Sequence, residues 1–168
     1  MSTFYAQPYD ICAAGFYFTS AQEFSAASAR LRNEFGQPVE EFEIQFIDGE
    51  AIDAELASAL GVHQGNVGRF IEAAEEWGEH EKRLLIIAAR ELGYVIDLES
   101  ADPEDFGIDI YEGLTMRELA AEFVDEGLLG EIPETLAHYI DLEAIARDLA
   151  MDYAETTIAG VALIYRSA

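Results

Sequence analysis

The excess of acidic side chains is the feature that most constrains how this chain can fold and what it can bind. Thirty-four Asp and Glu residues oppose nine Lys and Arg, which gives a formal net charge of −25, and Lys82 is the only lysine. Repulsion among like charges opposes folding unless the acids stay solvated and spread apart. Nucleic acids and anionic membranes bind to basic faces, so the charge argues against both as partners. We expect cations or basic proteins instead.

The apolar content is nevertheless sufficient for a packed interior. Hydrophobic residues make up 51% of the chain and include ten Phe and eight Tyr, which is unlike the composition of disordered chains. No apolar run approaches the roughly 18 residues that a membrane span requires. Cys12 is the only cysteine, so it forms no disulfide within the chain and suits a reducing compartment. These features predict a folded cytoplasmic protein.

The first part of the chain predicts strands flanking one helix. The aromatic-rich segments 3–8 and 14–19 are typical of short strands. A capping-box pattern at Ser20 predicts a helix that continues to about Asn33. Apolar and polar residues alternate over 39–48, which indicates a half-buried strand.

The middle of the chain predicts three consecutive helices, at 50–61, 66–78 and 81–93. Each pattern ends with a glycine, a residue that favours the left-handed backbone found at helix C-termini. Asn66 is a candidate N-cap of the second helix. Short connections favour antiparallel packing, so these helices predict a bundle.

The last part returns to mixed structure. A strand is predicted at 108–112, and a second capping-box pattern opens a helix at Thr115. Pro133 suits the first turn of a further helix, and Asp141 is a candidate N-cap of the next one. One or two strands at 156–166 follow.

Together these elements predict an α+β fold class with an acidic surface throughout. Three small domains are expected: an α+β domain over residues 1–61, a helical bundle over 62–106 and an α/β domain over 107–168.

Most catalytic and cofactor patterns are missing from the sequence. His63, His80 and His138 lack the i, i+4 spacing of a helical zinc site, so we predict no metal and no cofactor. Paired carboxylates for glycoside hydrolysis remain an unspecific alternative, since any two of the acids might face each other. The oxygen-rich segment 97–105 lacks the central Gly and the final Glu of an EF-hand loop. Cation binding there stays open beside the interpretation as a solvated acidic loop.

The spacing of the acids can also be compared with the spacing of phosphates in DNA. Glu41 and Glu43 would lie about 6.6–6.8 Å apart along a strand, and Glu72 and Glu76 about 6 Å apart along a helix axis. Both spacings are close to that of successive phosphates on one DNA strand. Duplex DNA carries one charge per about 1.7 Å, so the net charge of −25 corresponds to about 40 Å of duplex. The pattern favours either DNA mimicry or a generic acidic, salt-adapted protein-binding domain that does not compete with DNA.

One stretch near the C-terminus carries a specific resemblance. Residues 127–149 read GLLGEIPETLAHYIDLEAIARDL. This string resembles the shared motif of the ArdA antirestriction proteins, which runs Leu-Gly-Glu, Ile or Val, Pro, two variable positions, Leu, two more, Tyr-Ile-Asp, and then a helix ending Arg-Asp-Leu. The N-terminal strands and the segment EEFEI at 40–44 are similar in style to the start of that family, although Gln45 and Phe46 stand where members often have His-Asp.

The resemblance implies an elongated, three-domain chain whose C-terminal domain dimerises. Members are bacterial, are usually carried by mobile genetic elements, and inhibit type I restriction–modification enzymes by imitating bent duplex DNA. They catalyse no reaction and need no cofactor. The expected partners are therefore the basic DNA-binding groove of a type I restriction–modification enzyme and a second copy of the chain. Neither a nucleic acid nor a membrane is expected as a partner.

Two sets of residues are candidates for this function. The carboxylates expected to occupy the partner's groove are Glu40, Glu41, Glu43, Asp48, Glu72, Glu75, Glu76, Asp102, Glu104, Asp105, Asp109 and Glu112. The motif residues expected to act as a scaffold or dimer contact are Leu129, Gly130, Glu131, Ile132, Pro133, Leu136, Tyr139, Ile140 and Asp141.

Overall fold

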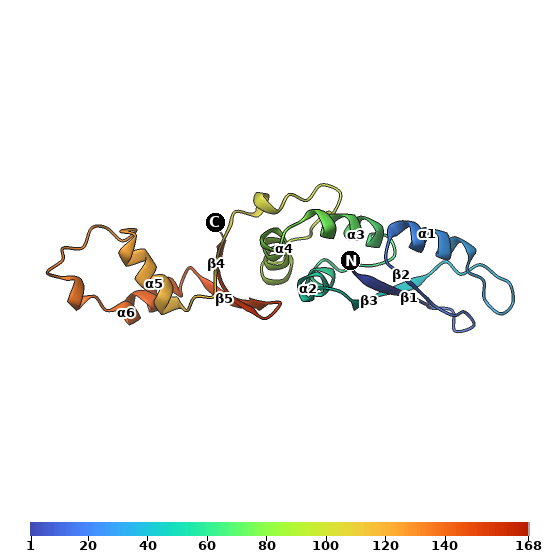
Figure 1. Cartoon of the computed structure of the whole chain (residues 1–168), viewed down its shortest axis with the longest axis horizontal. Coiled ribbons are helices and arrows are strands. Elements are labelled where there is room, and N and C mark those ends of the chain that lie inside the picture. Colours follow the sequence, from blue (N-terminus) through green and yellow to red (C-terminus); the bar gives the residue numbers. More distant parts are fainter. Residues whose placement is uncertain (168) are drawn as a thin grey trace. The chain divides into compact units, whose positions relative to one another are not determined.

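A computed structural model describes residues 1–167 of the chain. It contains helices and two small antiparallel sheets of three strands each, which confirms the mixed α+β class (Figure 1). The chain folds into two compact units, Met1–Asp105 and a second that begins at Phe106. The division into three domains stays a prediction.

The sheet of the first unit has the order β2-β1-β3. Its strands are β1 (Thr3–Pro8), β2 (Phe16–Phe18) and β3 (Phe42–Asp48). Both pairings are antiparallel, so Tyr5 of β1 lies between Tyr17 of β2 and Gln45 of β3. The predicted strands are thus confirmed, although the regular part of β3 begins at Phe42 rather than at residue 39.

The predicted cap of α1 (Ala21–Arg30) is confirmed at Ser20, whose hydroxyl accepts from the Glu23 amide at 3.2 Å. The Glu23 carboxylate, however, accepts from the backbone N–H and the hydroxyl of Thr19 at 2.7 and 2.9 Å. The return hydrogen bond is therefore displaced by one residue from a standard capping box. The helix ends at Arg30, short of the predicted Asn33.

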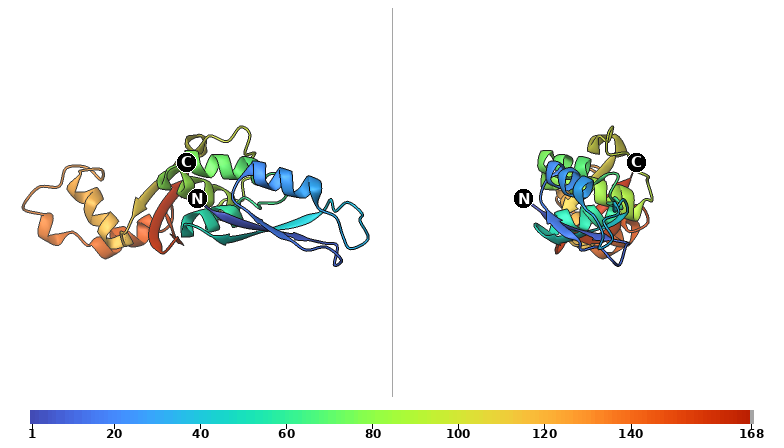
Figure 2. Two further views of the ribbon diagram at one scale, coloured as in Figure 1. Left: turned by 45° about the vertical axis from the view of Figure 1, so that its right-hand side comes forward. Right: turned by 90° about the vertical axis from the view of Figure 1, so that its right-hand side faces the viewer.

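Three helices follow, as predicted: α2 (Ala51–Ala59), α3 (Val67–Glu76) and α4 (Glu79–Ile86). A π-helical turn, Ile87–Glu91, extends α4. In Figures 1 and 2, α1 and α3 lie on the same side of the sheet, and α2 packs against α4.

The prediction that Gly78 closes α3 is wrong. The helix ends at Glu76, Trp77 has extended backbone, and Gly78 is the N-cap of α4 with a φ of −74°. Its N–H donates to the Glu81 carboxylate at 2.6 Å, so this acid holds the start of α4. Asn66 occupies the N-cap position of α3 as predicted, but its side chain does not cap the helix, because its Oδ1 accepts from the His63 amide at 2.7 Å.

Aromatic side chains form the core between this sheet and its helices. Phe18 contacts Phe24 of α1, with ring centroids 5.0 Å apart, and Phe4 contacts Phe70 of α3 at 6.1 Å. Phe4, Phe18 and Phe70 are fully buried. Because Phe4 and Phe70 come from either side of the predicted boundary at residue 61, helix α3 and the sheet share one core.

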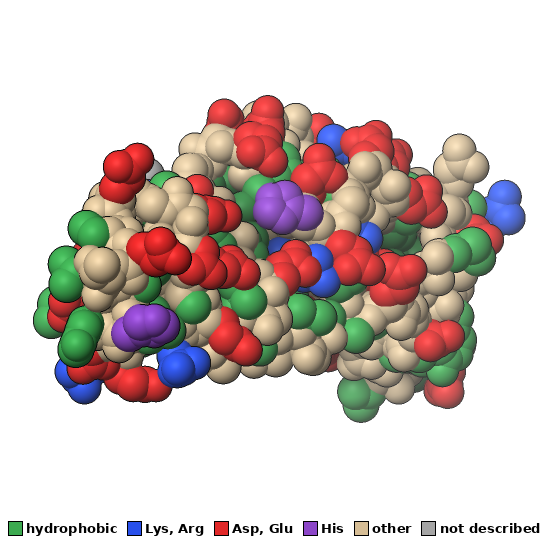
Figure 3. Space-filling view, turned by 60° about the vertical axis from the view of Figure 1, so that its left-hand side comes forward, with side chains coloured by type: hydrophobic (Ala, Val, Ile, Leu, Met, Phe, Trp, Pro, Cys, Tyr) green, Lys and Arg blue, Asp and Glu red, His purple; other side chains and the backbone are tan. Residues whose placement is uncertain are grey.

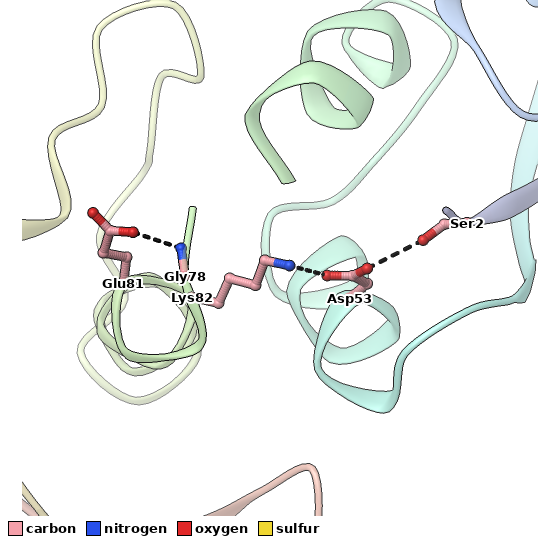
Figure 4. A network of polar contacts seen from close by, with 5 residues as sticks. All are labelled: Ser2, Asp53, Gly78, Glu81 and Lys82. Atoms are coloured by element: carbon pink, nitrogen blue, oxygen red, sulfur yellow. Dashed lines mark hydrogen bonds and ion pairs between the residues drawn. The ribbon is translucent and has the colours of Figure 1, made fainter. Parts of the chain in front are cut away.

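A buried ion pair joins α2 to α4 (Figure 4). Nζ of Lys82 lies 2.6 Å from Oδ1 of Asp53, and the side chains are only 7% and 10% exposed. The Ser2 hydroxyl donates to the other oxygen of Asp53 at 3.2 Å. The only lysine of the chain is thus part of the core of the first unit.

The sheet of the second unit has the order β4-β6-β5. Its strands are β4 (Ile108–Glu112), β5 (Ala154–Ile158) and β6 (Val161–Ser167). The predicted region 156–166 therefore forms two strands. A tight turn at Ala159 and Gly160 joins them, and both residues have positive φ, at 49° and 79°.

Helices α5 (Met116–Asp125) and α6 (Leu142–Leu149) pack against each other. Both predicted caps are confirmed. Thr115 and Glu118 form a reciprocal capping box, and Oδ1 of Asp141 accepts from the Ala144 amide at 3.1 Å. The core of this unit includes a cluster of Leu119, Phe123, Tyr153 and Ile164.

The prediction of a helix that begins at Pro133 is wrong. Residues 134–136 form turns, and a single 3-10 turn, Ala137–Tyr139, follows them. Leu136 and Tyr139 are both exposed, so this segment has no buried face to stabilise a longer helix. Across residues 1–167, no helix is both long and apolar enough to cross a membrane.

Candidate functional site

All twelve predicted carboxylates are exposed. Of the 34 acids, only Asp53 is buried, and Asp10, Glu55 and Glu81 are half-buried. On the face drawn in Figure 3, Asp and Glu side chains are dispersed among other residues, and Lys and Arg are few. Solvation of nearly all the acids is what a chain of this charge needs in order to fold.

The first group of carboxylates lies on and before β3: Glu40, Glu41, Glu43 and Asp48. The buried side chain of Phe42 points to the core, so its neighbours Glu41 and Glu43 point outward from the sheet. The Gln64 side chain accepts from the Phe42 amide at 2.7 Å and donates to the Glu40 carbonyl at 3.3 Å. These hydrogen bonds fix the backbone that carries the group.

The second group, Glu72, Glu75 and Glu76, lies on the exposed side of α3. Arg69 is close to two of its members: its Nη1 lies 3.7 Å from a Glu72 oxygen and 3.8 Å from a Glu76 oxygen. Its Nε also donates to the Leu98 carbonyl at 3.2 Å. Arg69 is absent from the predicted site, although its i, i+3 spacing from Glu72 is visible in the sequence. This arginine offsets part of the negative charge of the group.

The third group, Asp102, Glu104 and Asp105, surrounds a 3-10 turn at Pro103–Phe106. Asp102 accepts from the Glu104 amide at 3.1 Å, and the nearby Asp97 accepts from the Glu99 amide at 3.1 Å. These carboxylates cap local turns. Among the residues that the structure describes, no three His, Cys, Asp or Glu side chains are grouped to hold a metal ion.

The fourth group, Asp109 and Glu112, lies on β4 in the second unit. An Asp109 oxygen lies 3.3 Å from Nη2 of Arg166, which faces it on β6. The guanidinium of Arg166 also lies 5.4 Å from the ring centroid of Tyr153. Asp109 is thus partly neutralised, as Glu72 and Glu76 are.

Five of the motif residues line a hollow in the second unit. Its volume is about 660 Å³, and its walls include Ala121 and Val124 of α5 together with Ile132 and Ile140 of the motif. The side chains of Leu129, Leu136 and Tyr139 are 50%, 52% and 82% exposed. Gly130 has a φ of +97°, and Asp141 caps α6. Glu131 and Pro133 are exposed in the same segment and line the hollow. The motif therefore presents apolar side chains to solvent instead of filling the core.

The carboxyl groups with a lowered pKa belong to turns and caps. Hydrogen bonds from the Asn33 side chain and the Cys12 amide lower the pKa of Asp10. Hydrogen bonds from Thr115 lower the pKa of Glu118, and those from Thr19 lower the pKa of Glu23. The physical cause in each case is a local hydrogen bond to the charged form.

A comparison with known protein families supports the resemblance that the motif indicates. The family model described as antirestriction protein (ArdA) matches residues 18–162, which is most of the chain. No curated protein has significant sequence similarity to it.

Proposed function

Because the chain belongs to the ArdA family of antirestriction proteins, we propose that it inhibits type I restriction–modification enzymes by presenting its carboxylates to their DNA-binding groove in place of the phosphates of bent duplex DNA. Membership of the family implies inhibition of restriction enzymes without catalysis. The imitation of DNA, the type I class of the enzyme and the cytoplasmic location go beyond family membership and are what we propose.

The observation that carries the proposal is the contrast between exposed and buried acids. Twelve carboxylates lie exposed on strand β3, helix α3, strand β4 and the intervening turn. The one buried carboxylate, Asp53, is neutralised by the one lysine. The surface thus retains nearly all of the negative charge, in groups whose internal spacing is set by strand and helix geometry. Such a surface attracts a basic groove over long distances and raises the association rate.

We further propose that the motif segment joins two copies of the chain. Leu129, Leu136 and Tyr139 are exposed apolar side chains beside a hollow of about 660 Å³. Exposed apolar patches of this kind are typical of protein–protein contacts. A dimer would double the number of carboxylates available to one enzyme.

The test is cleavage of DNA by a type I enzyme in the presence of increasing amounts of this protein, at low and at high salt. We expect strong inhibition at low salt and weaker inhibition at high salt, because screening weakens exposed charge interactions. Labelled DNA should be displaced from the enzyme in parallel. No inhibition at low salt would refute the proposal and favour a generic acidic protein-binding domain.

A further inference from the structure

Two loops lie together at one end of the first unit. The connection from β1 to β2 and the connection from α1 to β3 are adjacent in both views (Figures 1 and 2). The Glu34 amide donates to the Cys12 carbonyl at 2.9 Å. The Asn33 amide group donates to an Asp10 oxygen at 2.8 Å. These hydrogen bonds join the two loops into one structural element.

The same two polar residues fix the conformation of each loop. Oδ1 of Asn33 accepts from the amides of Phe35 and Gln37 at 3.0 and 2.9 Å. The other oxygen of Asp10 accepts from the Cys12 amide at 2.8 Å. Asx turns of this kind hold a loop in one conformation. The side chains that these loops carry are therefore presented in fixed positions.

The side chains presented are large and apolar. Tyr9, Ile11 and Phe35 are 66%, 98% and 75% exposed. Ile11 and Cys12 of one loop, with Arg32 of the other, also line a hollow of about 430 Å³. Single exposed apolar residues are common, but a cluster on ordered loops marks an interaction surface. We name Tyr9, Ile11 and Phe35 the apolar tip.

The charge beside the apolar tip is mixed, unlike that of the carboxylate groups, because Asp10 and Glu34 belong to the same two loops as Arg32. Arg30 and Arg32 are exposed at the end of α1 and just beyond it. Nη1 of Arg32 donates to the carbonyls of Ala29 and Leu31 at 3.2 and 2.8 Å. The two arginines offset these two acids, so this end of the unit has little net charge to attract a basic groove and suits an apolar surface.

The apolar tip is nevertheless continuous with the carboxylates of β3. The Tyr9 amide donates to the Glu41 carbonyl at 3.2 Å, and Glu43 lies opposite Gln7 in the sheet. A partner whose groove holds Glu41 and Glu43 would therefore have its adjoining surface next to Tyr9.

We propose that the apolar tip docks on an apolar protein surface that borders the DNA-binding groove of the inhibited enzyme. The contact rests on the proposed function, because the enzyme is the partner that both surfaces share. It adds affinity that salt does not screen and that DNA itself cannot supply. The protein would then bind more tightly than its charge alone allows.

The test compares the double variant Ile11→Ser/Phe35→Ser with the unaltered protein in binding to a type I enzyme at low and at high salt. Both side chains are exposed, so the variant should keep its fold, as circular dichroism would verify. Loss of two anchors should weaken binding about tenfold at both salt concentrations. The matched control is Val95→Ser, which removes a fully exposed apolar side chain elsewhere in the unit and should bind normally.

The outcomes separate this proposal from the proposed function. If the unaltered protein does not bind the enzyme, the proposed function fails and the docking site fails with it. If the unaltered protein binds and the double variant binds equally well, only the docking site is overturned. Sedimentation provides a further check, because loss of self-association in the double variant would make the tip a contact between copies and would also overturn the proposal.

Discussion

Nζ of Lys82 and Oδ1 of Asp53 lie 2.6 Å apart between α4 and α2, and both side chains are almost completely buried. Burial of two charges is costly, and the pair is tolerable only because each ion compensates the other. In a chain with 34 acids, the only lysine is used inside the first unit and not on its surface. No lysine is therefore left on the surface of the unit to offset its negative charge.

Replacement of Lys82 by Met should destabilise the first unit by about 3–5 kcal/mol, because Asp53 would remain as a buried, unpaired charge. The double variant Lys82→Met/Asp53→Asn should recover part of this loss. Urea unfolding followed by the fluorescence of Trp77, which lies in this unit and is the only tryptophan, measures both effects. Glu72→Gln is the control, since its long, exposed ion pair with Arg69 contributes at most about 1 kcal/mol. Unchanged stability of Lys82→Met would contradict the prediction.

Removal of carboxylates should weaken inhibition gradually. The variant Glu41→Gln/Glu43→Gln should bind the enzyme roughly two- to thirtyfold less tightly at low salt, since each exposed charge contributes about 0.2–1 kcal/mol. The difference should shrink at high salt. A variant of equal charge, Asp152→Asn/Glu155→Gln, changes exposed acids outside the predicted groups and serves as the control. Complete loss of activity from one substitution would instead favour a single carboxylate site.

Substitution of Leu136 and Tyr139 by Ser should weaken self-association at least about tenfold, because both are exposed apolar side chains of the motif segment. The second unit should stay folded, since neither residue belongs to its buried core. Sedimentation velocity measures the oligomeric state, and Met151→Ser, at an equally accessible apolar position, is the control. A variant that remains dimeric and folded yet fails to inhibit would show that the motif contacts the enzyme directly.

The capping box of α5 should make the second unit sensitive to acid. Hydrogen bonds from Thr115 hold the pKa of Glu118 below its ordinary value of 4.5. A carboxyl group with a lowered pKa in the folded state stabilises the protein above its unfolded-state pKa, and this contribution disappears as the pH falls through the folded-state value. Glu118→Gln should therefore lower the thermal stability near neutral pH and reduce the loss of stability below pH 4.5.

Thermal unfolding of both proteins, monitored by circular dichroism across this pH range, isolates the effect of Glu118. The comparison with the unaltered protein is essential, because protonation of the remaining acids also relieves their mutual repulsion. Identical pH dependence in the two proteins would contradict the prediction that the lowered pKa of Glu118 contributes to stability.

Local patterns in the sequence were sufficient to predict several elements. Alternation over 39–48 predicted β3, and the spacing of Thr115 and Glu118 predicted the start of α5, because a single turn supplies all the partners concerned. Gly78 was misassigned since a glycine can end one helix or begin the next. The extended backbone of Trp77 and the hydrogen bond from Gly78 to Glu81 decide between the two.

Features that depend on tertiary packing were not predictable from local patterns. Pro133 suits a helix start, but the segment after it has no buried face to pack. Asp53 and Lys82 are far apart in the sequence, and nothing local pairs them. For the candidate site, composition predicted exposed carboxylates, whereas no local pattern predicted that Ile11 and Phe35 are exposed. They lie on two loops that the hydrogen bond between Asn33 and Asp10 joins, and these loops are far apart in the sequence.

The strand order β4-β6-β5 has a consequence for how the chain is made. Strand β6 (Val161–Ser167) lies between β4 and β5 and provides the hydrogen-bonding partner of both. During synthesis, β4 and β5 leave the ribosome before their common partner exists, so the second sheet closes only when β6 has emerged. The first unit, whose strands all lie before residue 49, can acquire its sheet much earlier. A newly made chain thus has an ordered, acidic first unit before its second unit is complete.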